Sequence, residues 1–112
     1  MEKQYTIRVK EFNLKFIVIF NFNFTKEHRK ITNCCIIEYP RKQIYSGATI
    51  RNPKDKDNTF EARRWAYKRA VMMMYLIWIK LDKTTMGFNE FWQLFRKALA
   101  ENKTYLLERI TS

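Results

Sequence analysis

The alternation of apolar and polar residues near the start of the chain limits most strongly what it can fold into. From position 12 every even position up to 24 is apolar, and most odd positions are polar. A period of two places alternate side chains on opposite faces of a strand. The segment therefore predicts a long strand with one aromatic face, made by Phe12, Leu14, Phe16, Val18, Phe20, Phe22 and Phe24. Tyr5, Ile7 and Val9 alternate with polar residues in the same way. They belong either to an earlier strand or to an extension of the same strand, and the unbroken connection through Lys10-Glu11 is compatible with both.

Two further strands follow this segment. The polar run Thr25 to Lys30 contains no glycine, which favours a hairpin loop of four or five residues. A strand is expected over residues 31–39, where Pro40 stops the ladder because it has no backbone donor. Residues 43–51 give the next strand. The sheet is expected to be an antiparallel meander of three to four strands.

The period changes to that of a helix after Asn58. Asn58 is followed three residues later by Glu61, the spacing at which each side chain bonds a free backbone donor of the other, so a helix should begin near Thr59. Small and apolar residues on one stripe are expected to face the sheet: Ala62, Ala66, Ala70, Met73 and Ile77. Every residue over 70–79 is apolar, so this part of the helix is expected to be covered on several sides.

A second helix supplies the expected cover. Its apolar residues recur at helical spacing and are Phe88, Phe91, Trp92, Phe95 and Leu99, while Asn89, Glu90, Arg96 and Lys97 face away. Tyr105 to Ile110 either extends this helix past Asn102 or forms a short terminal one. The expected fold is a single α+β domain over residues 1–112, with two C-terminal helices packed together and on one sheet face.

The chain is strongly basic, with a formal net charge of +11. The excess is spread as +2 over residues 1–24, +4 over 25–57 and +5 over 58–112. A distributed positive field favours nucleic acid, an anionic membrane or an acidic protein surface as the partner. A membrane surface is the weakest of these, because the basic helix has no apolar face to spare from the core.

Residues that carry catalysis or bind metals are sparse. His28 is the single histidine and lies in a charged turn, and the adjacent Cys34 and Cys35 read as free thiols, one on each face of a strand. Asp55 to Asn58 resembles the start of a calcium loop but lacks its glycine and its later glutamate. We expect no enzyme, no cofactor and no metal. The amino terminus shows no secretory signal, and a cytoplasmic protein is expected.

The basic residues around the start of the long helix are the candidate binding site. They precede the helix or occupy its first turns, where backbone donors also favour phosphate. The candidate nucleic-acid or effector-binding residues are Arg51, Lys54, Lys56, Arg63, Arg64, Lys68 and Arg69. The alternative is a solvated helical face on which Glu61 pairs with Arg64 and Trp65 is simply buried.

One pattern in the sequence is similar to that of a known group of proteins. It is formed by Gly47, Asn52, Pro53, Asp55, Ala66, Arg69 and Ala70. It resembles small phage-encoded proteins of unknown function in which a sheet leads to a Pro-Asp loop and an alanine-rich basic helix, over roughly residues 31–72. The strand-strand-strand-helix order is also similar to the latter part of a double-stranded-RNA-binding domain. The chain lacks that family's leading helix and its Gly-Pro-x-His loop. By analogy, anti-CRISPR inhibitors are also small basic phage proteins without catalytic motifs.

These observations give three functional hypotheses. The first is a non-catalytic phage or mobile-element anti-defence inhibitor in the host cytoplasm, which engages an RNA-guided nuclease through its guide RNA or its nucleic-acid channel. The second is a free-standing RNA- or DNA-binding accessory protein. The third is an oligomeric structural or assembly protein.

Overall fold

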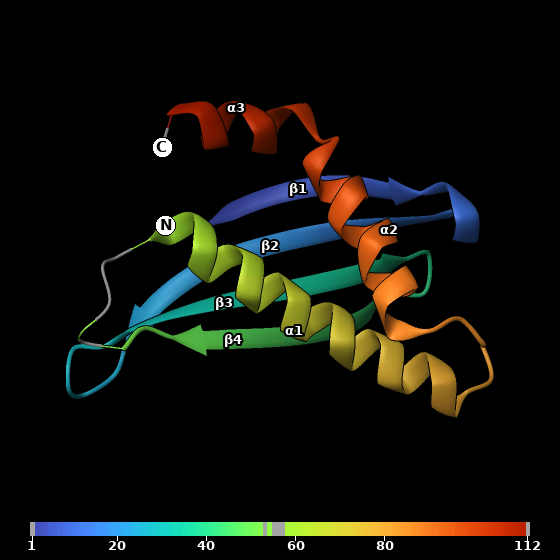
Figure 1. Ribbon diagram of the computed structural model, residues 1–112, viewed down its shortest axis with the longest axis horizontal. Coiled ribbons are helices and arrows are strands. Elements are labelled where there is room, and N and C mark those ends of the chain that lie inside the picture. Colours follow the sequence, from blue (N-terminus) through green and yellow to red (C-terminus); the bar gives the residue numbers. More distant parts are fainter. Residues whose placement is uncertain (1, 53, 55–57, 112) are drawn as a thin grey trace.

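The four strands form an antiparallel meander. The computed structural model describes residues 2–52, 54 and 58–111. The sheet order is β1-β2-β3-β4, and each strand pairs with its neighbour in sequence (Figure 1). The strands are β1 (Lys3–Val9), β2 (Leu14–Phe24), β3 (Lys30–Tyr39) and β4 (Gln43–Ile50). The predicted meander is confirmed, with four strands.

The amino-terminal alternation belongs to two strands. A 3-10 turn, η1 (Lys10–Phe12), separates β1 from β2, and Asn13 ends it in the left-handed region at φ 52°. Asparagine tolerates that conformation better than most residues. The chain reverses there, so Tyr5 lies opposite Val18 and Ile7 opposite Phe16 on the same buried face.

Helix α1 (Thr59–Lys80) begins at the predicted residue. The side chain of Asn58 accepts a hydrogen bond from the backbone N–H of Glu61 at 3.0 Å, as the capping pattern predicts. The helix lies directly on β4 at Gly47, where an added Cβ would stand 2.7 Å from the carbonyl oxygen of Ala66. Glycine at this position therefore allows the close approach of helix and sheet.

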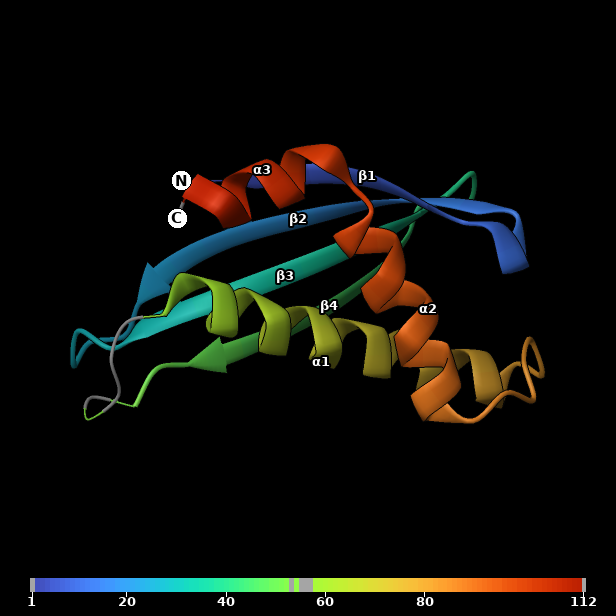
Figure 2. The ribbon, with the colours of Figure 1, turned by 45° about the horizontal axis from the view of Figure 1, so that its top comes forward.

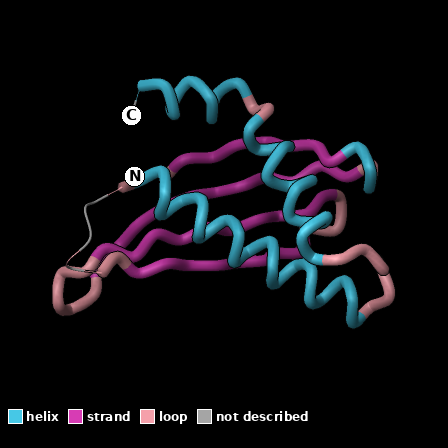
Figure 3. The backbone as a smooth tube through the Cα atoms, in the orientation of Figure 1, coloured by secondary structure: helices cyan, strands magenta, loops and turns pink. Residues whose placement is uncertain are grey.

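The covered side of α1 differs from the predicted stripe. Ala66 and Ala70 are buried, but Met73 and Ile77 are 45% and 39% exposed, and the burial continues through Val71, Met74 and Trp78. The prediction was wrong for Met73 and Ile77 because α1 crosses the strands obliquely (Figure 3). Its covered side consequently turns from the sheet toward the next helix. Residues 70–79 are thus covered on one side only. The expectations that they are covered on several sides, and that the basic helix has no apolar face to spare from the core, were therefore wrong.

The carboxy-terminal segment forms two helices, α2 (Phe88–Ala100) and α3 (Lys103–Thr111), so the chain has three C-terminal helices where two were expected. Asn102 separates them: its side-chain oxygen accepts from the N–H of Tyr105 at 3.1 Å, and its amide donates to the carbonyl of Thr6 at 2.8 Å. The hydrogen bond to Thr6 attaches Asn102 to β1. The residues after Asn102 therefore form a separate terminal helix and do not extend α2.

An aromatic core joins the helices to the sheet. The predicted apolar face of α2 is buried at Phe91, Trp92, Phe95 and Leu99, and Phe88 is partly buried. The ring of Phe91 lies 4.9 Å from that of Phe95 and 5.4 Å from that of Trp78 on α1. All three helices lie on one face of the sheet (Figure 2). The confirmed fold class is α+β.

Candidate nucleic-acid interface

Three arginines from three helices meet at one hollow on the helical side of the molecule. Arg64 comes from α1, Arg96 from α2 and Arg109 from α3, and all three side chains are exposed. We call this site the arginine groove. Its volume is about 150 Å³, and its remaining lining residues are apolar or aromatic: Phe60, Tyr67, Trp92, Leu99, Ala100 and Tyr105. No acidic side chain lines it among the described residues.

Aromatic rings contact one arginine of the groove and one lysine at its edge. The guanidinium carbon of Arg109 lies 5.5 Å from the centroid of the Phe60 ring. At the edge of the groove, Nζ of Lys68 lies 5.7 Å from the Trp92 ring and 5.4 Å from the Trp65 ring. These distances are within the range of cation–π attraction, so the rings help to position the two positive charges. No carboxylate among the described lining residues neutralises them.

Arginines in and beside the groove act on the hydroxyl of Tyr105. Burial raises the pKa of Tyr105, while Arg109, Arg63 and Arg64 act in the opposite direction by stabilising the phenolate. An anion placed in the groove would experience the same attraction. The groove is therefore an electropositive site with an apolar floor, the combination that suits a phosphate with an attached sugar or base.

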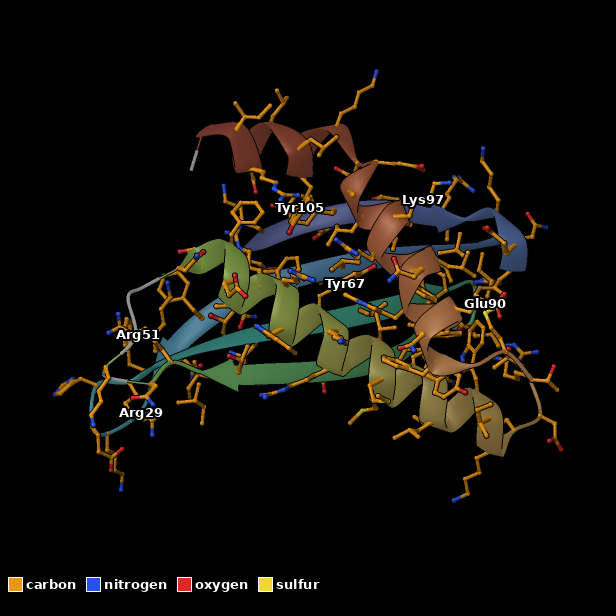
Figure 4. All side chains as sticks on the ribbon, viewed as in Figure 1. Arg29, Arg51, Tyr67, Glu90, Lys97 and Tyr105 are labelled. Carbon is orange, nitrogen blue, oxygen red and sulfur yellow. The ribbon has the colours of Figure 1, made fainter. Side chains whose placement is uncertain are left out.

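Contacts far apart in sequence bring the three helices together. The Tyr67 hydroxyl donates to the carbonyl oxygen of Phe95 at 2.7 Å and so joins α1 to α2. Figure 4 shows Tyr67 and Tyr105 between α1 and the two C-terminal helices. Rings of Tyr5 and Tyr105 meet edge to face at 5.3 Å, which joins α3 to β1. The groove therefore forms only when the three helices are packed together in the folded protein.

Arg63 lies beside the groove but is held by α3. Its Nη1 lies 3.4 Å from Oε2 of Glu108, and its guanidinium covers the ring of Phe20 at 5.8 Å. Glu108 also accepts a hydrogen bond from the Tyr5 hydroxyl and pairs with Lys3 at 3.3 Å. Burial lowers the pKa of Arg63. This predicted binding residue contributes to packing and is not presented to solvent like Arg64.

Two other predicted residues lie at the far end of the sheet. Arg51 and the exposed Lys54 follow β4, and Figure 4 places Arg51 near Arg29 of the β2–β3 loop. Nε of Arg29 donates to the carbonyl oxygen of Arg51 at 3.0 Å. A hollow of about 250 Å³ opens here beside Lys30 and Trp65, but the carboxylate of Glu61 lines it as well. Its charge is mixed, unlike that of the arginine groove.

Two predicted binding residues remain, Arg69 and Lys56. Arg69 lies on the opposite side of α1 from the groove, and its Nη1 donates to the carbonyl oxygen of Ala48 on β4 at 2.6 Å. Lys56 lies outside the described residues. The structure thus brings Arg64 and Lys68 together at the groove and places Arg51, Lys54 and Arg69 elsewhere.

Two details of the alternative, a plain solvated helical face, differ from the structure. Trp65 is 48% exposed, so the expectation that it is simply buried was wrong. The ion pairs between described side chains join Glu108, Glu38 and Glu101 to lysines or Arg63, and Glu61–Arg64 is not among them.

Arg96 and Arg109 line the groove but are absent from the predicted binding residues. Arg96 was correctly expected to face away from the α2 core, yet that exposed side of α2 adjoins α1 and α3. The available signal was the position of Arg96 four residues after Trp92, which places both side chains on neighbouring parts of one helical face. No comparable signal marked Arg109, because its position depends on the separate course of α3.

The other side chains that could react or bind a metal are the two cysteines and the His, Asp and Glu residues. Burial raises the pKa values of both cysteine thiols, Cys34 more than the half-buried Cys35, so they are poor nucleophiles at neutral pH. No group of three or more His, Cys, Asp or Glu side chains is placed to hold a metal ion within the described part of the chain. Among those residues, no helix is both long and apolar enough to cross a bilayer.

Comparison with family models, with curated proteins and with solved structures finds no match to this chain.

Proposed function

We propose that this protein is a non-catalytic binding module that engages nucleic acid through the arginine groove. The observation that carries the proposal is the convergence of Arg64, Arg96 and Arg109 on one hollow whose described lining contains no carboxylate. Gathering like charges opposes folding, so such a cluster is more easily explained by an anionic ligand than by stability. Lys68 and the exposed Trp65 extend the site along α1, where a base could stack beside a bound phosphate.

Salt dependence of RNA binding tests this proposal. If Arg64, Lys68, Arg96 and Arg109 each contact a phosphate of single-stranded RNA, log K should fall with log salt at a slope of about −3. Replacing Arg64 and Arg96 together by glutamine should make this slope shallower by about 1.4, since each contact contributes about 0.7. The measurement is fluorescence anisotropy with a labelled single-stranded RNA over a series of salt concentrations.

A matched variant distinguishes the groove from the overall charge. Arg8→Gln with Arg41→Gln removes the same charge from two exposed positions outside the groove. This control should retain nearly the wild-type slope. An equal loss in both variants would show that RNA responds only to the net charge, and would reject the groove as the site.

We further propose that the nucleic acid belongs to an RNA-guided nuclease, and that the protein is a phage or mobile-element anti-defence inhibitor. The support is the basic, motif-poor sequence and its resemblance to small phage-encoded proteins. Its test is the affinity for a guide-loaded nuclease relative to that for the bare guide RNA. An inhibitor should bind the loaded nuclease at least about tenfold more tightly. Equal affinities would favour a free-standing accessory protein instead.

A further inference from the structure

A second exposed surface lies on α1, on the side turned away from the arginine groove. Four apolar side chains, Met72, Met73, Leu76 and Ile77, are 36–59% exposed there. They line a shallow hollow of about 510 Å³, and the other lining residues are Arg69 and Lys80. We call these six residues the methionine stripe. It arises because α2 covers only one side of the apolar half of α1.

The composition of the stripe favours a protein partner. Methionine side chains are flexible and polarisable, and they adapt to apolar surfaces of varied shape. Exposed apolar side chains gathered on one face of a helix, with charged residues at the ends, are typical of a surface that packs against another helix. A nucleic-acid backbone would gain little from the four apolar side chains, so this surface differs in kind from the arginine groove.

The charges at the two ends indicate the chemistry of the partner. Arg69 and Lys80 are eleven residues apart, which is about 16 Å along the helix axis. Both flank the apolar residues, and no acidic side chain is part of the described lining. A complementary surface would carry carboxylates at a matching separation on either side of an apolar stretch.

The same two charges oppose pairing with a second copy of the chain. A two-fold pair of antiparallel α1 helices centred on the stripe would place Arg69 of one copy opposite Lys80 of the other, because a two-fold contact is reciprocal. Both ends would then bring like charges together, in addition to the repulsion between two chains of net charge +11.

We propose that the methionine stripe binds an amphipathic helix of another protein, in which acidic residues flank the apolar face at both ends. This surface is independent of the arginine groove and of the function proposed for it. The probe is a pair of synthetic helical peptides of about 18 residues with the same leucine stripe. One carries glutamates eleven residues apart at the ends of that stripe, and the other carries lysines at those positions.

Peptide affinity, measured by fluorescence anisotropy at physiological salt, should be at least about tenfold higher for the glutamate peptide. Leu76→Glu should weaken its binding by a similar factor, and the double variant Arg69→Glu with Lys80→Glu should invert the preference. The matched control is Ile44→Glu, which makes the same change at an exposed position on β4 and should leave the affinity within about twofold. Circular dichroism verifies the fold of each variant.

Three results would overturn the proposal. One is equal affinity for both peptides, or affinity that Leu76→Glu leaves unchanged. Another is loss of the preference in Arg64→Gln with Arg96→Gln, which would show that the arginine groove binds the peptide as a simple polyanion. The third is a wild-type dimer in sedimentation analysis that Leu76→Glu dissociates, which would assign the stripe to a second copy of the chain.

Discussion

Nη1 of Arg63 on α1 lies 3.4 Å from Oε2 of Glu108 on α3, and both side chains are largely buried. An arginine in the first turns of a basic helix thereby serves to hold the terminal helix against the rest of the fold. The position of α3 in turn sets the position of Arg109, so the Arg63–Glu108 pair supports the arginine groove without belonging to it.

Removing the charge of Glu108 should destabilise the protein. Glu108→Gln weakens its ion pairs with Arg63 and Lys3 and its hydrogen bond from Tyr5. We expect the free energy of unfolding in urea at neutral pH to fall by about 1–3 kcal/mol, between the values for surface and buried pairs. The control is Glu101→Gln, whose pair with Lys97 is exposed and should contribute less than about 0.5 kcal/mol. Equal losses would contradict a special role for Glu108.

The contact between Gly47 and α1 gives a second prediction. Gly47→Ala should lower the free energy of unfolding by about 3 kcal/mol, because the new methyl group meets the backbone at Ala66 and Ala70, which can move only with the whole helix. Gly87→Ala is the matched control, since a Cβ there meets nothing within 4 Å. Thermal or urea unfolding of both variants measures the difference. A stable Gly47→Ala variant would show that α1 can move away from β4 at little cost.

Local patterns predicted most of the sheet and both long helices. The period of two identified β2, Pro40 marked the end of β3, and Asn58 with Glu61 located the start of α1. Each of these signals acts within a few residues. A strand face or a helix cap is therefore visible in sequence.

The errors all concern relationships between elements. The helical period predicts Met73 and Ile77 in the core, but both are exposed, because the period does not indicate the direction in which α1 crosses the sheet. The separate course of α3 depends on Asn102 reaching Thr6, 96 positions earlier. The proximity of Arg96 and Arg109 to Arg64 was not predicted for the same reason, since three helices must be placed before it is known.

A buried polar network beneath the C-terminal half of α1 gives a third prediction. Nε1 of Trp78 donates to the Tyr45 hydroxyl at 3.1 Å, and that hydroxyl donates to Oε1 of the buried Glu38 at 3.1 Å. Tyr45→Phe leaves Nε1 of Trp78 without its hydrogen-bond acceptor and Oε1 of Glu38 without its donor. The free energy of unfolding should fall by about 2 kcal/mol.

The control for this network is Tyr39→Phe, which removes a hydroxyl from a partly exposed position on the adjacent strand. It should change the free energy of unfolding by less than about 0.5 kcal/mol. Urea unfolding of both variants at neutral pH makes the comparison. If Tyr45→Phe were as stable as Tyr39→Phe, the network would contribute nothing to stability.

Alkaline pH should destabilise the fold through Tyr67. Burial is the largest cause that raises the pKa of its hydroxyl well above the ordinary value, and the hydroxyl donates to the Phe95 carbonyl. Above about pH 10 the unfolded chain releases this proton while the folded chain keeps it. The unfolded state then binds fewer protons, so stability falls as pH rises. The contribution is fully present below the unfolded pKa and is lost as pH approaches the folded value.

The variant Tyr67→Phe separates this effect from general alkaline unfolding. Near neutral pH it should be less stable than wild type by about 1 kcal/mol, because the hydrogen bond to Phe95 is lost. Its stability should decline less between about pH 8 and about pH 11, since it has no phenol to ionise at that position. Urea unfolding across this range should therefore show the two proteins converging. Parallel declines would mean that other groups, such as the buried thiol of Cys34, whose pKa burial also raises, account for the alkaline sensitivity.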